Sequence, residues 1–174
     1  ALAVTAVPAG ADTISYYLTL SNDLPDGIDY AQVTISDSAD VAGDIDFTVE
    51  VVGDAFIVNG KNFGMQTFLF NVDDDISLDK SNIINMSENW NVNTSRNAGG
   101  GFGNFDVLLK GKGNSRTSEL TFSITGIMND SVYSYAVSNN ADDSGEYFST
   151  HIAGFDESFN VTSAKFAGSV AVPV

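Results

Sequence analysis

The chain has no cysteine, three prolines and seven basic residues in 174 positions. The lack of cysteine excludes a disulfide framework, a thiolate zinc site and a cysteine nucleophile. No apolar run approaches the roughly 18 residues of a membrane-spanning helix, so no such span is expected in these residues. Because 23 Asp and Glu give a net charge of −16, the chain repels phosphate backbones and anionic membrane surfaces, and nucleic acid is not an expected partner.

Alternation of apolar and polar residues with a period of two is the strongest pattern that is present. Glycine, asparagine and aspartate turns separate the alternating segments, and the glycine-rich run 97–105 lacks the lysine of a phosphate loop, which favours a hairpin loop. The pattern predicts an all-β fold, a two-sheet antiparallel sandwich of jelly-roll or Greek-key type. One short helix is expected within 78–90, with Asp79 or Ser81 as its N-cap. The clearest strands are 13–20, 44–51 and 119–125, and weaker ones are 30–36, 55–60, 65–72, 105–111, 131–138, 146–155 and 164–172.

The first eleven residues are almost entirely small or apolar, and they have two interpretations. An Ala-x-Ala pattern at 9–11 matches a signal-peptide cleavage site. In residues 2–7, however, both faces of an extended strand are apolar, which is typical of a strand buried on both sides. We therefore predict an apolar N-terminal strand with its hinge at 1–11 and a β-sandwich domain at 12–174, the strand packing on its own sandwich or on a neighbouring subunit. The predicted interface residues are Leu2, Val4, Ala6 and Val7.

Catalytic machinery is not expected. His151 is the only histidine and lies in a strand pattern, and the chain has no nucleophile elbow to complete a Ser-His-Asp triad. Paired carboxylates could serve a glycosidase, but Asp-rich turns explain them without chemistry. We predict that the protein is not an enzyme, and we assign no catalytic and no cofactor-binding residue.

Acidic turns raise the question of a metal, because calcium takes about six to eight hard oxygen ligands from such loops. Three clusters occur, and none matches the EF-hand loop. Two interpretations stay open: calcium is a cofactor bound by at least one cluster, or the clusters are solvated turns. The candidate ligands are Asp37, Asp40, Asp44 and Asp46, then Asp73, Asp74, Asp75 and Asp79, and finally Asp142, Asp143 and Glu146.

Aromatic residues offer a different kind of site, because their faces stack on sugar rings. Packing within a β core is the competing interpretation. The candidates are Trp90, Tyr30, Tyr133, Tyr135 and Tyr147. Glycosylation is permitted, but not implied, by the sequons at Asn85, Asn93, Asn129 and Asn160.

Two stretches, GNFDVLLKGKGNSRTSELTFSITG and GEYFSTHIAGF, resemble the β-domain of secreted bacterial proteins of the PEP-CTERM (exosortase-sorted) class. The shared pattern is a Phe-Asp strand at 105–106, an L-x-F-x-[IVL]-x-G strand at 120–126 and an aromatic-x-x-H-[IV] segment at 148–152, within roughly residues 102–155. The sorting tail of that class does not occur in these 174 residues. The resemblance implies export across the inner membrane of a Gram-negative bacterium and a place at the cell surface or in the matrix, and it implies no catalytic residues.

These observations favour a secreted, non-enzymatic structural protein of the bacterial cell surface or biofilm matrix. It would be a subunit of an extracellular filament assembled by β-strand donation, by the logic of donor-strand pili and TasA-type matrix fibres. Its expected partners are further copies of itself and extracellular polysaccharide. The alternative is a carbohydrate-binding β-sandwich module that calcium assists, and a secreted hydrolase comes third.

Overall fold

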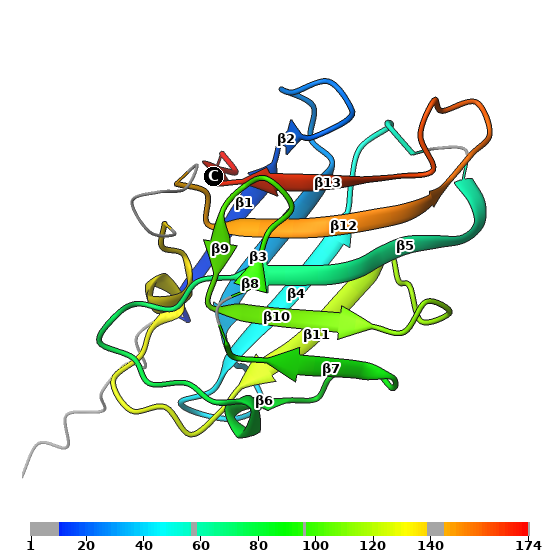
Figure 1. The fold of residues 1–174 in the computed structure, drawn as a ribbon. Coiled ribbons are helices and arrows are strands. Elements are labelled where there is room, and N and C mark those ends of the chain that lie inside the picture. The colour runs from blue at the N-terminus through cyan, green and yellow to red at the C-terminus, as the bar shows by residue number, and fades with distance from the viewer. Residues whose placement is uncertain (1–10, 57–58, 96, 139–144, 174) are drawn as a thin grey trace, which may run out of the picture.

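The alternating segments of the sequence form β-strands, and these strands build two six-stranded antiparallel sheets that face each other. The computed structural model describes residues 11–56, 59–95, 97–138 and 145–173. In Figure 1 sheet B lies in front and sheet A behind it, with their strands crossing obliquely. The predicted two-sheet antiparallel sandwich is confirmed.

Each sheet is best followed in its spatial order. Sheet A consists of β14 (Val170–Ala171), β1 (Thr13–Leu18), β3 (Ala31–Asp37), β4 (Ile45–Val51), β11 (Glu119–Ile124) and β6 (Ile83–Ile84). Sheet B consists of β2 (Leu20–Ser21), β13 (Ser163–Gly168), β12 (Phe148–Phe155), β5 (Asn59–Phe70), β10 (Val107–Gly111) and β7 (Trp90–Asn93). The remaining elements are a hairpin of β8 (Asn97–Ala98) and β9 (Asn104–Phe105) and two 3₁₀ turns, η1 (Lys80–Asn82) and η2 (Val132–Tyr135).

Aromatic side chains fill the space between the sheets. Phe47 on β4 and Phe122 on β11 are direct cross-strand partners, and their rings stack with centroids 4.5 Å apart. Phe47 also contacts Phe70 of sheet B, at 5.2 Å between centroids. All three side chains are buried, so these contacts join the two sheets through tightly packed apolar surface.

Some predictions of local structure were wrong. Residues 131–138 were expected to form a strand, but the chain turns there into η2, because the Ser131 N–H donates to Ser134 Oγ at 3.0 Å and starts a helical turn. The helix expected within 78–90 is only the three-residue turn η1, although Asp79 is its N-cap as predicted. The segment 55–60 is a strand only from Asn59, and residues 57–58 lie outside the described residues.

Two further expectations concern the ends of the chain and its loops. The glycine-rich run 97–105 forms the β8–β9 hairpin, which confirms the loop prediction. The N-terminal strand predicted within 1–11, with its interface residues Leu2, Val4, Ala6 and Val7, lies outside the described residues except for residue 11. Among the described ranges, no helix combines the length and the apolar character needed to cross a membrane.

Candidate functional site

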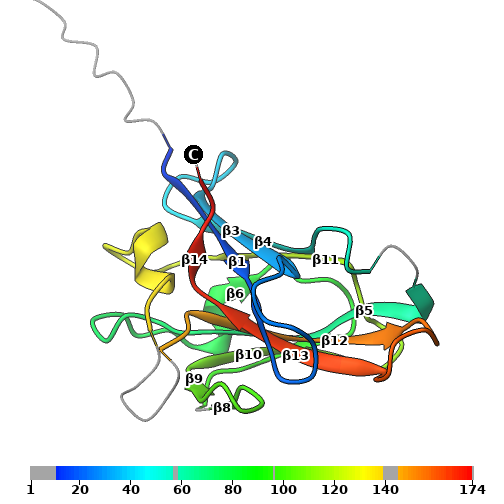
Figure 2. The ribbon, with the colours of Figure 1, turned by 90° about the horizontal axis from the view of Figure 1, so that it is seen from above.

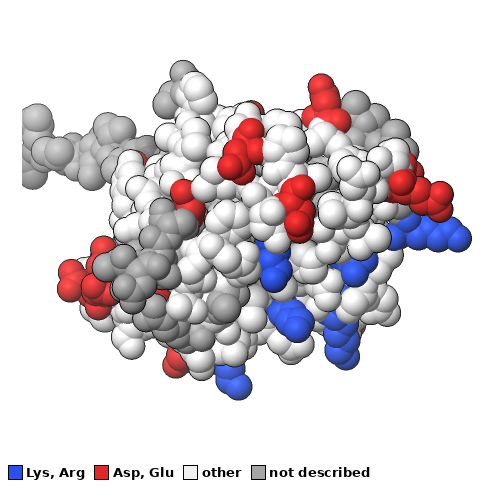
Figure 3. Space-filling view, turned by 45° about the horizontal axis from the view of Figure 1, so that its top comes forward, with Lys and Arg blue, Asp and Glu red and all other residues white. Residues whose placement is uncertain are grey.

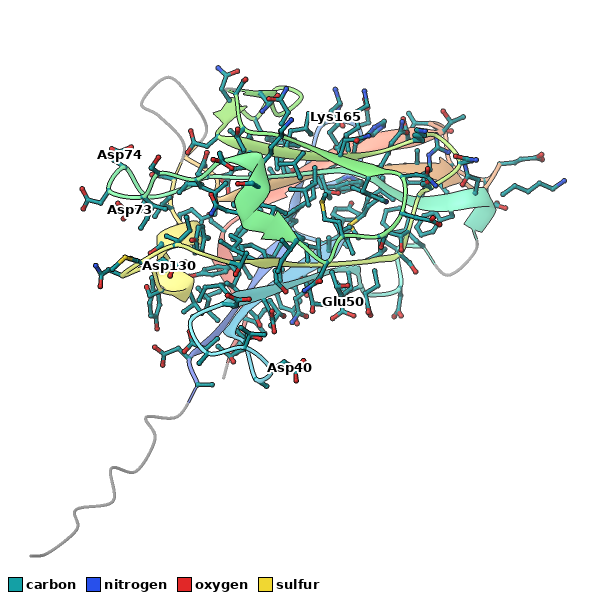
Figure 4. All side chains as sticks on the ribbon, turned by 90° about the horizontal axis from the view of Figure 1, so that it is seen from below. Asp40, Glu50, Asp73, Asp74, Asp130 and Lys165 are labelled. Atoms are coloured by element: carbon teal, nitrogen blue, oxygen red, sulfur yellow. The ribbon has the colours of Figure 1, made fainter. Side chains whose placement is uncertain are left out.

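Members of the first acidic cluster accept hydrogen bonds from residues of sheet A and its neighbouring loops. Asp37 accepts a hydrogen bond from the Asp12 N–H at 2.9 Å. Asp44 is buried and accepts from Thr125 Oγ1 at 2.7 Å, and Asp46 accepts from Ser123 Oγ at 2.7 Å. Each of these three carboxylates thus has a hydrogen-bond donor from the fold. Asp40 lies in the exposed loop beside them (Figure 4), and it lines a hollow of about 280 Å³ together with Asp44 and Asp46.

The second cluster is spread along a loop. Asp73 accepts from the Asp75 N–H at 3.0 Å, while Asp74 is exposed (Figure 4). Asp79 caps η1, and its hydrogen bonds from the Ser81 hydroxyl and then the Ser81 N–H lower the pKa of that carboxyl. These side chains serve local turns, as Asx residues commonly do.

The third cluster falls mostly outside the described residues, which exclude Asp142 and Asp143. Its remaining member, Glu146, accepts a hydrogen bond from Ser169 Oγ at 2.8 Å. In the part of the chain that the structure describes, no three acidic or histidine side chains converge as metal ligands would. Calcium binding at any of the three clusters therefore stays a prediction.

Three of the five aromatic candidates are core residues, so the predicted sugar-stacking platform does not form from them. Trp90, Tyr30 and Tyr135 are buried, and each directs its polar atom to a partner, as buried Tyr and Trp side chains usually do. The partners are Ser115 O at 3.0 Å for Trp90 Nε1, Pro25 O at 2.6 Å for the Tyr30 hydroxyl and an Asp130 carboxylate oxygen at 2.5 Å for the Tyr135 hydroxyl.

The other two aromatic candidates lie near the β14 edge of sheet A. Tyr133 is 58% exposed, and Tyr147 packs edge-on against Tyr16 with centroids 5.4 Å apart. Burial raises the pKa of the Tyr16 hydroxyl, and the neighbouring Tyr147 and Tyr133 raise it further. The three tyrosines therefore form one cluster at this side of the molecule.

The β14 edge is short, apolar and uncharged. β14 pairs with β1 through Tyr16 and Tyr17, and Val172 N–H adds a bond to Ser15 O at 3.0 Å (Figure 2). Val170 is 51% exposed, and residues 168–173 contain no charged side chain.

Natural edge strands are commonly protected from pairing with another chain by charges, by proline or by being very short. β14 is only two residues long, Pro173 follows it closely and Ser169 holds the Glu146 carboxylate beside it. The protection that this edge lacks is a charged side chain on the strand itself.

A hollow of about 470 Å³ lies beside β14. Its wall is formed by the start of β1, by Tyr133 of η2 and by the segment 171–173. Ile14 and Tyr16 supply apolar surface to it from β1. This hollow and the uncharged edge together form what we call the β14 edge site.

A second hollow, of about 360 Å³, lies on the outer face of sheet B. Four strands (β5, β10, β12 and β13) contribute to it, and the Gly99–Gly100 turn of the β8–β9 hairpin forms one side. β5 and β12 shift register beside it, and at that bulge the His151 N–H donates to Thr67 Oγ1 at 3.2 Å. We call this the sheet B hollow.

Basic groups surround the sheet B hollow. Lys110 and Lys165 line it, together with His151. Arg116 is held nearby, with Nε and Nη2 both donating to Gln66 Oε1 at 3.2 Å. Burial lowers the pKa of His151, and the positive charges of Lys165 and then Arg116 lower it further.

Sequence reasoning considered His151 only as an isolated residue, and it missed both sites. Each is assembled from segments far apart in the chain, so no local motif marks it. The only local signals were the glycine-rich run 97–105 and the uncharged segment 168–173. Neither the protein-family models, the curated proteins nor the solved structures give a match to this chain.

Proposed function

We propose that the protein is a secreted, non-enzymatic structural subunit of the bacterial cell surface or biofilm matrix. Copies would join by β-strand addition, with residues 1–8 of one copy docking at the β14 edge site of the next. The observation that carries this proposal is the uncharged, half-exposed edge strand β14 beside an apolar hollow. Such an edge can accept a further strand through its main-chain hydrogen bonds, while side-chain pockets give specificity.

The donated segment has properties that suit this edge. Residues 2–7 are nearly apolar on both faces of an extended strand, with Thr5 as the one polar residue, and they carry no charge. Eight extended residues span about 26 Å, so only part of the segment can pair with the two-residue β14. Burial of each Val or Leu side chain contributes about 1.5–3 kcal/mol, so Leu2, Val4 and Val7 could stabilise a subunit contact.

The direction of donation decides between a polymer and a monomer. A contact between the N-terminal segment of one copy and a different surface of the next is heterologous, and it generates an open filament when the rotation does not close. The competing arrangement is docking of the segment on its own sandwich. The same N-terminal segment docks in both arrangements, so the oligomeric state distinguishes them: the first gives a polymer and the second a monomer.

Deletion of residues 1–8 tests the donor. We expect the truncated protein to remain folded and to lose filaments, measured by sedimentation velocity and electron microscopy. Val4→Asp should have the same effect, because it places a charge in a segment that becomes buried. Filaments of the truncated protein that match those of the parent, or a parent that is monomeric under all conditions, would overturn the proposal.

A pair of lysine substitutions tests the acceptor. Val170→Lys puts a charge on β14, whereas Asn91→Lys puts the same charge on β7, an exposed edge position of sheet B. Because a charged edge discourages strand addition, only Val170→Lys should reduce filament formation. Equal loss in both variants would trace the effect to net charge and would contradict the edge assignment.

A further inference from the structure

We infer that the sheet B hollow is a binding site for an acidic polysaccharide, a sugar chain that carries carboxylates, held through Lys110 and Lys165. This goes beyond the proposed self-assembly, because it uses the opposite sheet and a different ligand. The inference rests on the charge of that face, on the lack of ion-pair partners for the two lysines within the described residues, and on the residues that line the hollow.

Charge is sorted between the two sheets. The six strands of sheet B, as the structure bounds them, contain no Asp or Glu, and they contain Lys61, Lys110 and Lys165. Figure 3 shows Lys and Arg gathered together on the lower part of the view, where the sheet B face lies, with most acids elsewhere. A protein of net charge −16 thus presents a basic face, which attracts anions locally.

The two lysines of the hollow are available to a ligand. Within the described ranges, neither Lys110 nor Lys165 forms an ion pair with a carboxylate. Lys165 lies across the Gly100 turn, because a Cβ on Gly100 would come 1.9 Å from Lys165 Cδ. Gly100 also has φ of +65°, so a glycine is needed there both for the turn and for the placement of the lysine.

The lining of the hollow matches an acidic sugar better than a neutral one. Besides the basic groups it presents polar groups and two leucines. These are Gln66, Thr67, Ser149, Thr150, the Gly99–Gly100 backbone, Leu69 and Leu108. No Phe, Tyr or Trp occurs among the described residues that line it, so it lacks the stacking surface that neutral sugars use. Charge-assisted hydrogen bonds from lysine to carboxylate are stronger than neutral ones. They would supply the affinity that ring stacking gives at sites for neutral sugars.

A second copy of the protein is the less favoured occupant. The acids on the strands of sheet A that could meet these lysines are Asp37, Asp46, Glu50 and Glu119. Asp37 and Asp46 already accept hydrogen bonds within sheet A. A second copy would therefore have to present the neighbouring Glu50 and Glu119 to the hollow, and the self-association readout in the test below separates that outcome from sugar binding.

The test measures binding of oligogalacturonate to the full chain by isothermal titration calorimetry at low salt. The comparison ligands are a neutral galactose oligomer of equal length and polyglutamate, which carries carboxylates without sugar rings. We expect the double variant Lys110→Gln/Lys165→Gln to weaken oligogalacturonate binding by about tenfold or more. Lys61→Gln is the matched control, since Lys61 is an exposed lysine of the same sheet that does not line the hollow.

Gly100→Ala provides an independent variant that keeps every charge. It should displace Lys165 and weaken binding, with the melting temperature reporting that the fold persists. Unchanged binding in the double variant, an equal loss with Lys61→Gln, or equal affinity for the neutral oligomer or polyglutamate would overturn the inference. Loss of self-association with intact oligogalacturonate binding in the double variant would also overturn it, because the hollow would then serve a second copy.

Discussion

The outer faces of the two sheets have the same architecture and opposite charge. The strands of sheet A carry Asp37, Asp46, Glu50 and Glu119 and no Lys or Arg, whereas those of sheet B carry three lysines and no acid. In Figure 4, Glu50 and Lys165 lie on opposite sides of the sandwich. The net charge of −16 therefore describes the sheet A face but not the sheet B face, and a partner excluded by the net charge can still be accepted by sheet B.

Each face also contains a pair of ionisable groups of the same sign across neighbouring strands, although His151 is charged only at low pH because its pKa is lowered. Glu50 and Glu119 are direct partners on β4 and β11, and His151 and Lys165 are direct partners on β12 and β13. Like charges directly opposite each other destabilise a sheet. Substitutions in one pair at a time therefore test how the acidic face of sheet A and the basic face of sheet B each affect stability.

The largest change in stability should come from a substitution in the aromatic layer that packs between the two sheets. Phe47→Ala deletes a ring that contacts both Phe122 and Phe70, and we expect a loss of about 3–5 kcal/mol in the free energy of unfolding, measured with urea. Thr121→Ala is the control, because Thr121 is exposed on the same strand as Phe122 and should cost within about 0.5 kcal/mol. Similar costs for both variants would show that this aromatic layer does not hold the sheets together.

A smaller effect should come from relieving the acidic pair of sheet A. Glu119→Lys replaces repulsion with attraction to Glu50 and should stabilise the fold by about 0.2–1 kcal/mol at low salt. High salt should remove the gain, because it screens exposed charges. Glu88→Lys changes the net charge equally in an exposed loop, so an equal rise in melting temperature for both would attribute the effect to net charge.

The smallest change in stability should come from protonation of His151, which is paired with Lys165 on sheet B. The pKa of His151 is lowered in the folded state, so the unfolded chain binds the proton more tightly. The associated stability is present above the ordinary histidine pKa, near 6.5, and is lost as the pH falls through the folded value. Melting temperatures between about pH 7.5 and 5 should therefore fall more in the parent than in His151→Gln. Parallel curves for the two proteins would contradict this prediction.

Periodicity predicted the strands whose two faces differ, such as 44–51 and 119–125, which contain β4 and β11. It failed for 131–138, where a serine cap starts a turn although the apolar spacing resembles a strand. The sorting of charge between sheets could not be read from the sequence, because it depends on which strands become neighbours. The two hollows were missed for the same reason, since each joins segments that only tertiary pairing brings together.

Among the described residues, β14 is the last strand in chain order, yet its neighbour β1 is the first. The outer side of β1 therefore stays uncovered until the far end of the chain folds back onto it. Pairing between such distant segments forms slowly, because a large loop must close first. If copies join by strand addition, as proposed above, a segment of another chain would compete with β14 for this side of β1 during that interval. A higher protein concentration during refolding should then increase the joined fraction.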